Sequence, residues 1–271
     1  MIPIKDNIPT DRFPFVTVAL IVANIVLYLL SIRHGGSIIS GPDSQETFKY
    51  GAIPYSLTHG GKHCAEFARQ TISGPQPVGV FCGGQRLPDG TIAHVGAQGT
   101  IATWETIFTS MFMHASILHI GGNMLFLWIF GNNVEDSMGP IKYIGFYIVG
   151  GLAALALQVA IGPNSTAPTL GASGAIAAVL GGYIMLYPRA RVLTVVFIIL
   201  LFPVIELPAV LMLGIWFAEQ AAFAAVGLTH PAGGSGGVAY FAHIGGFLFG
   251  WLAIRLLATN RKQVPPAHPV N

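Results

Sequence analysis

The stretch Gly171-Ala172-Ser173-Gly174 opens an apolar run that continues to Tyr187. A second apolar run, later in the chain, begins Ala242-His243-Ile244-Gly245-Gly246. A serine and a histidine in such runs are hard to explain by folding alone, because polar groups at membrane depth are costly. The same two residue types form the smallest pair that makes a hydroxyl nucleophilic near neutral pH. The surrounding sequence indicates whether this pair is functional.

The composition is that of a membrane protein. Of the 271 residues, 53% are hydrophobic and 9% are charged, whereas about a quarter of the residues in a soluble domain are charged. The net charge of +2 is small and there is no basic stripe, so nothing favours a nucleic-acid partner. We therefore expect an all-α, multi-pass protein embedded in the lipid bilayer.

Six apolar runs are candidates for membrane-spanning helices. They lie near residues 13–32, 113–130, 141–161, 171–187, 207–226 and 240–258. The basic residues that flank these runs all lie on one side of the membrane if both termini are cytoplasmic, as the positive-inside rule requires. They are Lys5, Arg12, Lys142, Arg189, Arg191, Arg255, Arg261 and Lys262. We predict an integral protein of a bacterial inner (cell) membrane with both termini in the cytoplasm.

The apolar stretch 192–205 does not fit this scheme. Pro203, Glu206 and Pro208 interrupt or follow it, which argues against one long helix. We expect a segment that lies at the inner interface or packs against the bundle. A seventh span is the alternative.

The loop 34–103 is rich in glycine, proline and polar residues and is expected outside the membrane. It contains both cysteines, Cys64 and Cys82, and a pair of cysteines in an exported loop predicts a disulfide. The alternative is a zinc site in which His59 and His63 join the cysteines. Their spacing matches no standard zinc site, so we predict no metal.

The run 171–187 is short for a membrane span. About 17 residues make a helix of about 25 Å, and the hydrocarbon core is about 30 Å thick. Arg189 and Arg191 hold its inner end at the cytoplasmic surface. Ser173 should therefore lie below the outer surface, in a cavity. The run 240–258 has the same direction, which places His243 at a similar depth.

Small residues favour close packing of these two helices. Gly246 and Gly250 form a GxxxG spacing on the histidine helix, which lets backbones approach closely. Gly174, Ala178 and Gly181 follow Ser173 on the other helix. Such packing would bring Ser173 and His243 within hydrogen-bonding distance. In the alternative, GxxxG serves packing only and the serine is a helix cap.

A further polar group lies in the run 113–130. His119 and Asn123 are four residues apart and project from one helical face, and His114 lies nearby. An imidazole and an amide there are suitable donors to a developing oxyanion. The alternatives are hydrogen bonds that hold the bundle together, and a metal site, for which this helix supplies no carboxylate or cysteine.

The sequence favours a dyad over a Ser-His-Asp triad, because no carboxylate falls near His243 in the runs 171–187 or 240–258. Glu219, in the outer half of the run 207–226, is the one candidate for a third member. It could equally serve a water cavity or a helix contact.

These motifs resemble those of the rhomboid intramembrane serine proteases. The matching pieces are His114…His119-xxx-Asn123, Leu125-Phe126-Leu127-Trp128, Gly131-Asn132-Asn133-Val134-Glu135-Asp136, Gly171-Ala172-Ser173-Gly174 and Ala242-His243-xx-Gly246. The resemblance covers roughly residues 104–258. We expect a single rhomboid membrane domain over residues 1–271, a rhomboid-like bundle of six transmembrane helices, and no cofactor.

The resemblance also implies roles. Ser173 would be the nucleophile, His243 the general base and then acid, and His119 and Asn123 the oxyanion hole together with the Ser173 backbone N–H. The substrates would be transmembrane segments of other membrane proteins, cut near their outer ends. The oligomeric state is not implied.

The chain departs from the pattern of some bacterial members at three places. Trp104-Glu105 stands where they have Trp-Arg, and Ala177 stands where they have a tyrosine stacked on the histidine. The cysteine-containing loop is unusually long. His243 must therefore be held by other residues.

Two other functions are consistent with parts of this pattern. A rhomboid-like pseudoprotease would bind transmembrane segments without cutting them, but it is expected to lack the serine or the histidine. A small-solute transporter also has polar groups at mid-depth, but no inverted repeat is visible. For the protease, we expect the glycine-rich stretch 229–237 to act as a mobile cap.

Overall fold

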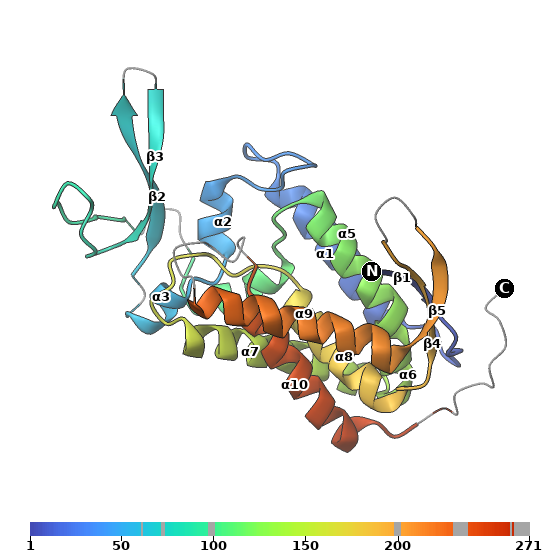
Figure 1. Cartoon of the computed structure of the whole chain (residues 1–271). Coiled ribbons are helices and arrows are strands. Elements are labelled where there is room, and N and C mark those ends of the chain that lie inside the picture. The colour runs from blue at the N-terminus through green and yellow to red at the C-terminus, as the bar shows by residue number, and fades with distance from the viewer. Residues whose placement is uncertain are drawn as a thin grey trace. The chain divides into compact units, whose positions relative to one another are not determined.

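The computed structural model describes residues 1–60, 62–71, 74–96, 101–197, 202–229, 238–260 and 262. These residues are predominantly helical (Figure 1). The chain divides into two compact units. Unit 1 comprises Met1–Ala23, Gly121–Leu157 and Ser173–Asn271, and unit 2 comprises Asn24–Ile120 and Gln158–Ala172.

Helices lie at all six predicted positions. They are α1 (Phe15–Ser31), α5 (Ile117–Phe126), α7 (Pro140–Ile161), α8 (Ser173–Leu186), α9 (Ala209–Thr229) and α10 (Tyr240–Leu257). Of the described helices, α7, α9 and α10 are long and apolar enough to cross a membrane. A bent pair, Thr106–Phe112 with Ile117–Met138, would make a fourth span, whereas α1 and α8 are shorter apolar helices. The count of six spans stays a prediction.

The helix at the second predicted span, near 113–130, has other ends than that range. The helix begins at Ile117, and it continues past residue 130 through a π-helical segment, η2 (Leu127–Gly131), into α6 (Asn132–Met138). The residues of α6 are mostly polar, so low hydropathy alone would place them in a loop outside the membrane. They are buried in the structure, where Asn133 is 1% exposed and Glu135 is 4% exposed.

Glu135 caps the beginning of α1. One carboxylate oxygen accepts from the backbone N–H of Val16 at 3.0 Å. The other accepts from the backbone N–H of Thr17 at 2.8 Å and from its hydroxyl at 2.7 Å. The first N–H groups of a helix have no intrahelical partner and carry a partial positive charge, so a carboxylate there is favourable.

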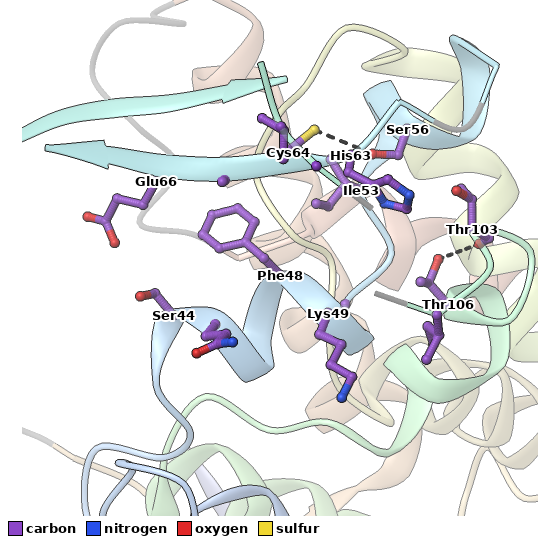
Figure 2. Close-up of a pocket in the computed structure, with 16 residues that line it drawn as sticks. Ser44, Phe48, Lys49, Ile53, Ser56, His63, Cys64, Glu66, Thr103 and Thr106 are labelled. Atoms are coloured by element: carbon purple, nitrogen blue, oxygen red, sulfur yellow. Dashed lines mark hydrogen bonds between the residues drawn. The ribbon is translucent and has the colours of Figure 1, made fainter. Parts of the chain in front are cut away.

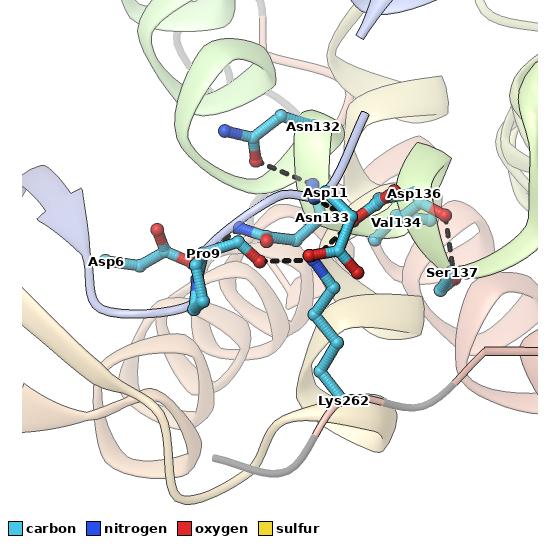
Figure 3. A network of polar contacts seen from close by, with 9 residues as sticks. All are labelled: Asp6, Pro9, Asp11, Asn132, Asn133, Val134, Asp136, Ser137 and Lys262. Carbon is cyan, nitrogen blue, oxygen red and sulfur yellow. Dashed lines mark hydrogen bonds and ion pairs between the residues drawn. The ribbon is translucent and has the colours of Figure 1, made fainter. Parts of the chain in front are cut away.

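A second polar network joins the two ends of the chain in unit 1 (Figure 3). The Lys262 ammonium lies 2.5 Å from a carboxylate oxygen of Asp136 and 3.2 Å from one of Asp11. It also donates to the backbone carbonyl of Pro9. Asp136 is 4% exposed at its side chain, so the ammonium balances a buried charge.

The structure corrects the all-α expectation, because it contains strands. In unit 1, β1 (Ile2–Asp6), β4 (Arg191–Val195) and β5 (Val204–Pro208) form an antiparallel sheet in the order β1-β4-β5. The described part of the stretch 192–205 is thus a hairpin and not a helix. Val192 and Thr194 alternate with less buried neighbours along β4, a period typical of strands.

The helices α8 and α10 lie in close contact, as predicted (Figure 1). A Cβ atom built on Gly246 would clash with the carbonyl oxygen of Gly174. One built on Gly250 would clash with the carbonyl oxygen of Ala178, and one built on Gly181 with that of Phe247. Only glycine at these positions permits this separation of the two backbones.

Unit 2 contains the predicted external loop 34–103. Its elements are α2 (Ser44–Tyr50), α3 (Pro54–Thr58), β2 (Cys64–Thr71), β3 (Gly74–Cys82), α4 (Thr106–Thr109) and the 3₁₀ turn η1 (Ser110–Phe112). The strands β2 and β3 pair antiparallel in a hairpin that extends away from α2 and α3 (Figure 1). Residues 230–237 of the predicted cap lie outside the described residues, so the cap stays a prediction.

Replacement of Gly250 by valine should destabilise the fold. The added side chain meets the backbone of Ala178, which cannot move as a side-chain tip would, and we expect a loss of about 1–3 kcal/mol in the free energy of unfolding. Unfolding in detergent would measure it. The control is Gly214→Ala on α9, where a Cβ meets nothing within 4 Å. Equal stability of the two variants would contradict the close contact.

Asp6 is a buried carboxyl group at the end of β1, 7% exposed. It accepts hydrogen bonds from the Tyr183 hydroxyl at 2.5 Å and the Asn133 amide at 2.7 Å. Burial raises the pKa of Asp6 from 3.8 to about 6, and the Tyr183 hydrogen bond opposes that shift. The folded state therefore binds this proton more tightly than the unfolded state.

The free energy of unfolding should consequently fall as pH rises from 3.8 to about 6 and above. The contribution of Asp6 is fully present below its unfolded pKa of 3.8 and is lost as pH passes its folded pKa of about 6, a change of about 3 kcal/mol. Unfolding at a series of pH values would measure it, with Asp6→Asn as the variant that lacks this dependence. Parallel pH curves for the two proteins would refute the assignment.

Candidate active site

Ser173 and His243 lie together in unit 1. The Ser173 hydroxyl is 2.8 Å from Nε2 of His243. Ser173 is the first residue of α8, and His243 lies in the first turn of α10. Both side chains are half-buried. The distance permits proton transfer from the hydroxyl to the imidazole.

The backbone before Ser173 turns sharply. Gly171 has a φ of +120°, a conformation that favours glycine. Its N–H donates to the carbonyl of Ser110 at 2.8 Å, which fixes this turn within unit 2. Because α8 begins directly at Ser173, the backbone N–H of that residue belongs to the first turn and has no intrahelical partner.

The third residue in contact with this pair was not foreseen from the sequence. The amide oxygen Oε1 of Gln220, on α9, lies 2.7 Å from Nδ1 of His243. Gln220 is 8% exposed, whereas the preceding Glu219, the predicted candidate, is exposed. Gln220 carries no charge, so it is not among the carboxylates that a triad would lead one to expect. The available signal was a glutamine in an apolar helix, four residues after Trp216 and so on the same face.

Two aromatic side chains flank the imidazole. The Trp216 ring centroid lies 5.9 Å from that of His243, with the planes tilted by 34°. The Tyr240 ring lies 6.4 Å away and nearly perpendicular, at 89°. These rings and Gln220 contact His243 in the absence of a tyrosine at position 177, where the buried Ala177 has no ring to stack on the imidazole.

The two predicted oxyanion donors each have a hydrogen-bonding group suited to that role. In unit 2, Nδ1 of His119 accepts from the backbone N–H of Ala115 at 3.3 Å, so the neutral imidazole carries its proton on Nε2. In unit 1, Asn123 is buried, and its Nδ2 has no hydrogen-bond partner among the described residues. A buried unsatisfied donor is costly unless it serves a ligand.

His114 packs its ring against that of His119, with centroids 5.1 Å apart. It is fully buried, and its Nδ1 contacts the carbonyl oxygen of Phe112 at 3.2 Å. These contacts indicate that His114 supports the position of the His119 ring. Among the described residues, no group of three or more His, Cys, Asp or Glu is arranged to hold a metal ion.

The cysteines of unit 2 are adjacent at the base of the hairpin. The sulfur atoms of Cys64 and Cys82 lie 1.93 Å apart. A bonded pair supplies no thiolates, so this arrangement favours the disulfide over the zinc alternative. The His59 ring instead stacks on Tyr55, with centroids 3.9 Å apart.

Unit 2 also contains a pocket of about 280 Å³ beside this hairpin (Figure 2). Charged and polar side chains that line it include Lys49, His63 and Glu66, and Phe48 and Ile53 add apolar surface. Neither Ser173 nor His243 lines it. The sequence predicts a disulfide at Cys64 in this part of the loop, but no pocket.

Comparison with known proteins identifies the region of the chain that carries Ser173, His243 and Gln220. Residues 102–260 match the family model of the Rhomboid domain. The chain is 32% identical over 169 residues to "Rhomboid protein 1, mitochondrial" of Saccharomyces cerevisiae, covering 58% of this chain and 44% of that protein. Over 102 residues it is 34% identical to "RHOMBOID-like protein 12, mitochondrial" of Arabidopsis thaliana, covering 32% and 30%.

A human protein gives a similar match. The chain is 30% identical over 147 residues to "Presenilin-associated rhomboid-like protein, mitochondrial" of Homo sapiens, covering 52% of this chain and 35% of that protein. The chain thus spans less than half the length of each of these relatives. All three carry mitochondrial names, which conflicts with the bacterial membrane predicted from the sequence.

Proposed function

This chain belongs to the rhomboid family, and we propose that it is an intramembrane serine endopeptidase in which Ser173 is the nucleophile and His243 the general base. The observation that carries the proposal is the distance of 2.8 Å between the Ser173 hydroxyl and Nε2 of His243. Membership of the family makes the chain an integral membrane protein. Its active site would therefore have to hold water within a bilayer.

The reaction would proceed in two stages. His243 takes the Ser173 proton as the oxygen attacks the scissile carbonyl carbon, and then gives that proton to the departing amine. A water molecule, deprotonated by the same imidazole, then releases the acyl group from Ser173. Since Gln220 accepts from Nδ1–H, the lone pair of the neutral imidazole lies on Nε2, as this step requires.

Charge that develops on the carbonyl oxygen needs donors. We assign this role to the Ser173 backbone N–H, His119 Nε2–H and the Asn123 amide. The first belongs to the unpaired beginning of a helix, and the Asn123 amide has no other hydrogen-bond partner among the described residues. Such preorganised donors are often the largest single contribution to catalysis.

The proposed substrates are transmembrane segments of other membrane proteins, cut near their outer ends. A helical backbone holds its carbonyl groups in hydrogen bonds, so the scissile stretch must unwind before Ser173 can reach it. In our proposal six spans surround the site, with both termini on the cytoplasmic side, as the positions of the basic residues favour.

The two alternative functions lack specific support. A pseudoprotease that binds without cutting would have no need of a paired serine and histidine, and here both are present and in contact. No observation in the described structure favours a transporter.

A serine-directed fluorophosphonate should label the folded protein at Ser173. The paired imidazole makes that hydroxyl nucleophilic, so labelling and cleavage of a panel of transmembrane substrates should both be lost in Ser173→Ala. Mass spectrometry of the products would give the site of cleavage. Cleavage that persists in Ser173→Ala, or a folded wild-type protein that neither labels nor cleaves, would reject the proposal.

Replacement of Asn123 by alanine should lower kcat by about 100- to 1000-fold, with a smaller effect on KM, because an oxyanion donor acts mainly in the transition state. Steady-state cleavage of one substrate would measure it. The matched control is Asn132→Ala, an asparagine on the same continuous helix that is not part of the proposed site. Equal kcat values for the two variants would remove Asn123 from the oxyanion hole.

A further inference from the structure

We infer that Gln220 is a positioning residue that fixes the orientation and tautomer of His243, in the place where a triad has its carboxylate. This inference rests on the proposed function of Ser173 and His243. It rests on two consecutive hydrogen bonds that connect three side chains from three helices. Gln220 on α9 contacts one ring nitrogen of His243, and Ser173 on α8 contacts the other.

The distances define a continuous hydrogen-bond chain. Oε1 of Gln220 lies 2.7 Å from Nδ1, and the Ser173 hydroxyl lies 2.8 Å from Nε2. An amide oxygen only accepts, so the proton of the neutral imidazole must lie on Nδ1. Nε2 then carries the lone pair and accepts a hydrogen bond from the Ser173 hydroxyl. The other tautomer would make Ser173 the acceptor and prevent its activation.

An amide suits this position better than a carboxylate when the histidine is neutral. Gln220 is 8% exposed and lies in an apolar helix, where an isolated charge would be strongly disfavoured. The neutral amide provides the acceptor without that cost. Its dipole also stabilises the imidazolium that forms during the reaction, although less than a full negative charge would.

Neighbouring rings make the amide effective as a positioning group. Trp216 and Tyr240 restrict the tilt of the imidazole from two directions. Neither ring contact defines whether Nε2 or the carbon Cε1 faces Ser173, since a ring flip by 180° exchanges these two atoms and preserves both contacts. The hydrogen bond that His243 Nδ1–H donates to Oε1 of Gln220 removes this ambiguity, because only a nitrogen can donate there. Stacking between Phe217 and Phe247, with centroids 4.6 Å apart, holds α9 against α10.

Other titratable side chains lie on the elements around His243. On α9 and α10 these are Glu219, Tyr240 and Arg255; on α7 and α8 they are Lys142, Tyr143, Tyr147 and Tyr183. Of these, Tyr240 has the described contact with the imidazole. Glu219 precedes Gln220 but is exposed. An exchange at Gln220 therefore changes the electrostatic surroundings of His243 most directly.

The test compares three variants of the whole protein in detergent. Gln220→Met keeps the length of the side chain but removes the strong acceptor. We expect kcat to fall about 10- to 100-fold, a part of what a general base contributes, with little change in KM. Gln220→Glu restores an acceptor, and its activity should exceed that of Gln220→Met. Glu219→Gln, next to it on the exposed side, is the control and should behave as wild type.

The pH profile separates positioning from a purely structural role. A carboxylate at position 220 stabilises the imidazolium, so His243 stays protonated to a higher pH. The acidic limb of kcat/KM should then move upward by about 1 pH unit in Gln220→Glu and stay in place in Glu219→Gln. Wild-type kcat in Gln220→Met, or equal loss of activity in Gln220→Met and Gln220→Glu, would overturn the inference.

A measurement without turnover covers the case in which a variant does not fold. In ¹⁵N-histidine-labelled Ser173→Ala protein, NMR should show the His243 proton on Nδ1, with the signal assigned by its loss in His243→Ala. A proton on Nε2 would overturn the inference. The proposed function fails separately, if Ser173→Ala retains cleavage. If Ser173→Ala is inactive while Gln220→Met has wild-type kcat, only the role of Gln220 is lost.

Discussion

Contact between the backbones of α8 and α10 is the constraint on which the proposed site depends. A side chain larger than hydrogen at Gly246 or Gly250 would meet a carbonyl oxygen of α8. Near the N-terminal ends of these two helices, Ser173 and His243 come within 2.8 Å of each other. Packing and chemistry are therefore not separable here, because the small residues that join the helices also define the distance between hydroxyl and imidazole. A looser pair of helices would leave two isolated polar groups in an apolar environment.

Much of this arrangement could be predicted from the sequence, because its signals are local. The apolar runs gave the helix positions, and the GxxxG spacing gave the contact of Gly246 and Gly250 with α8. The errors arose where the partner of a residue is distant in sequence. Asn133 and Glu135 look solvent-exposed until Asp6 and α1 are placed against them. The strands β1 and β4 were missed because each is short and finds its partner far along the chain.

Gln220 was missed for a chemical reason. The one ionisable candidate for a third group is Glu219, whereas the residue in contact with His243 is uncharged. In an apolar helix an uncharged acceptor meets the same geometric need at a lower cost of desolvation. For membrane-embedded sites, glutamine and asparagine in apolar helices thus merit the same consideration as acidic residues. Trp216 lies four residues before Gln220, on the same face of α9, and both side chains contact His243. A tryptophan and a glutamine at this spacing in an apolar helix can thus indicate a group that holds a histidine.

The cap that Glu135 forms on α1 has a consequence for biosynthesis. Thr17 and Glu135 are separated by 118 positions, so the first helix is synthesised long before its cap. At about 5–20 residues per second, the ribosome needs roughly 6–24 s to produce the intervening chain. During that interval the first amides of α1 must be satisfied by water or by lipid head groups. The cap on α1 can therefore form only after the helix Ile117–Met138, which contains Glu135, has been synthesised.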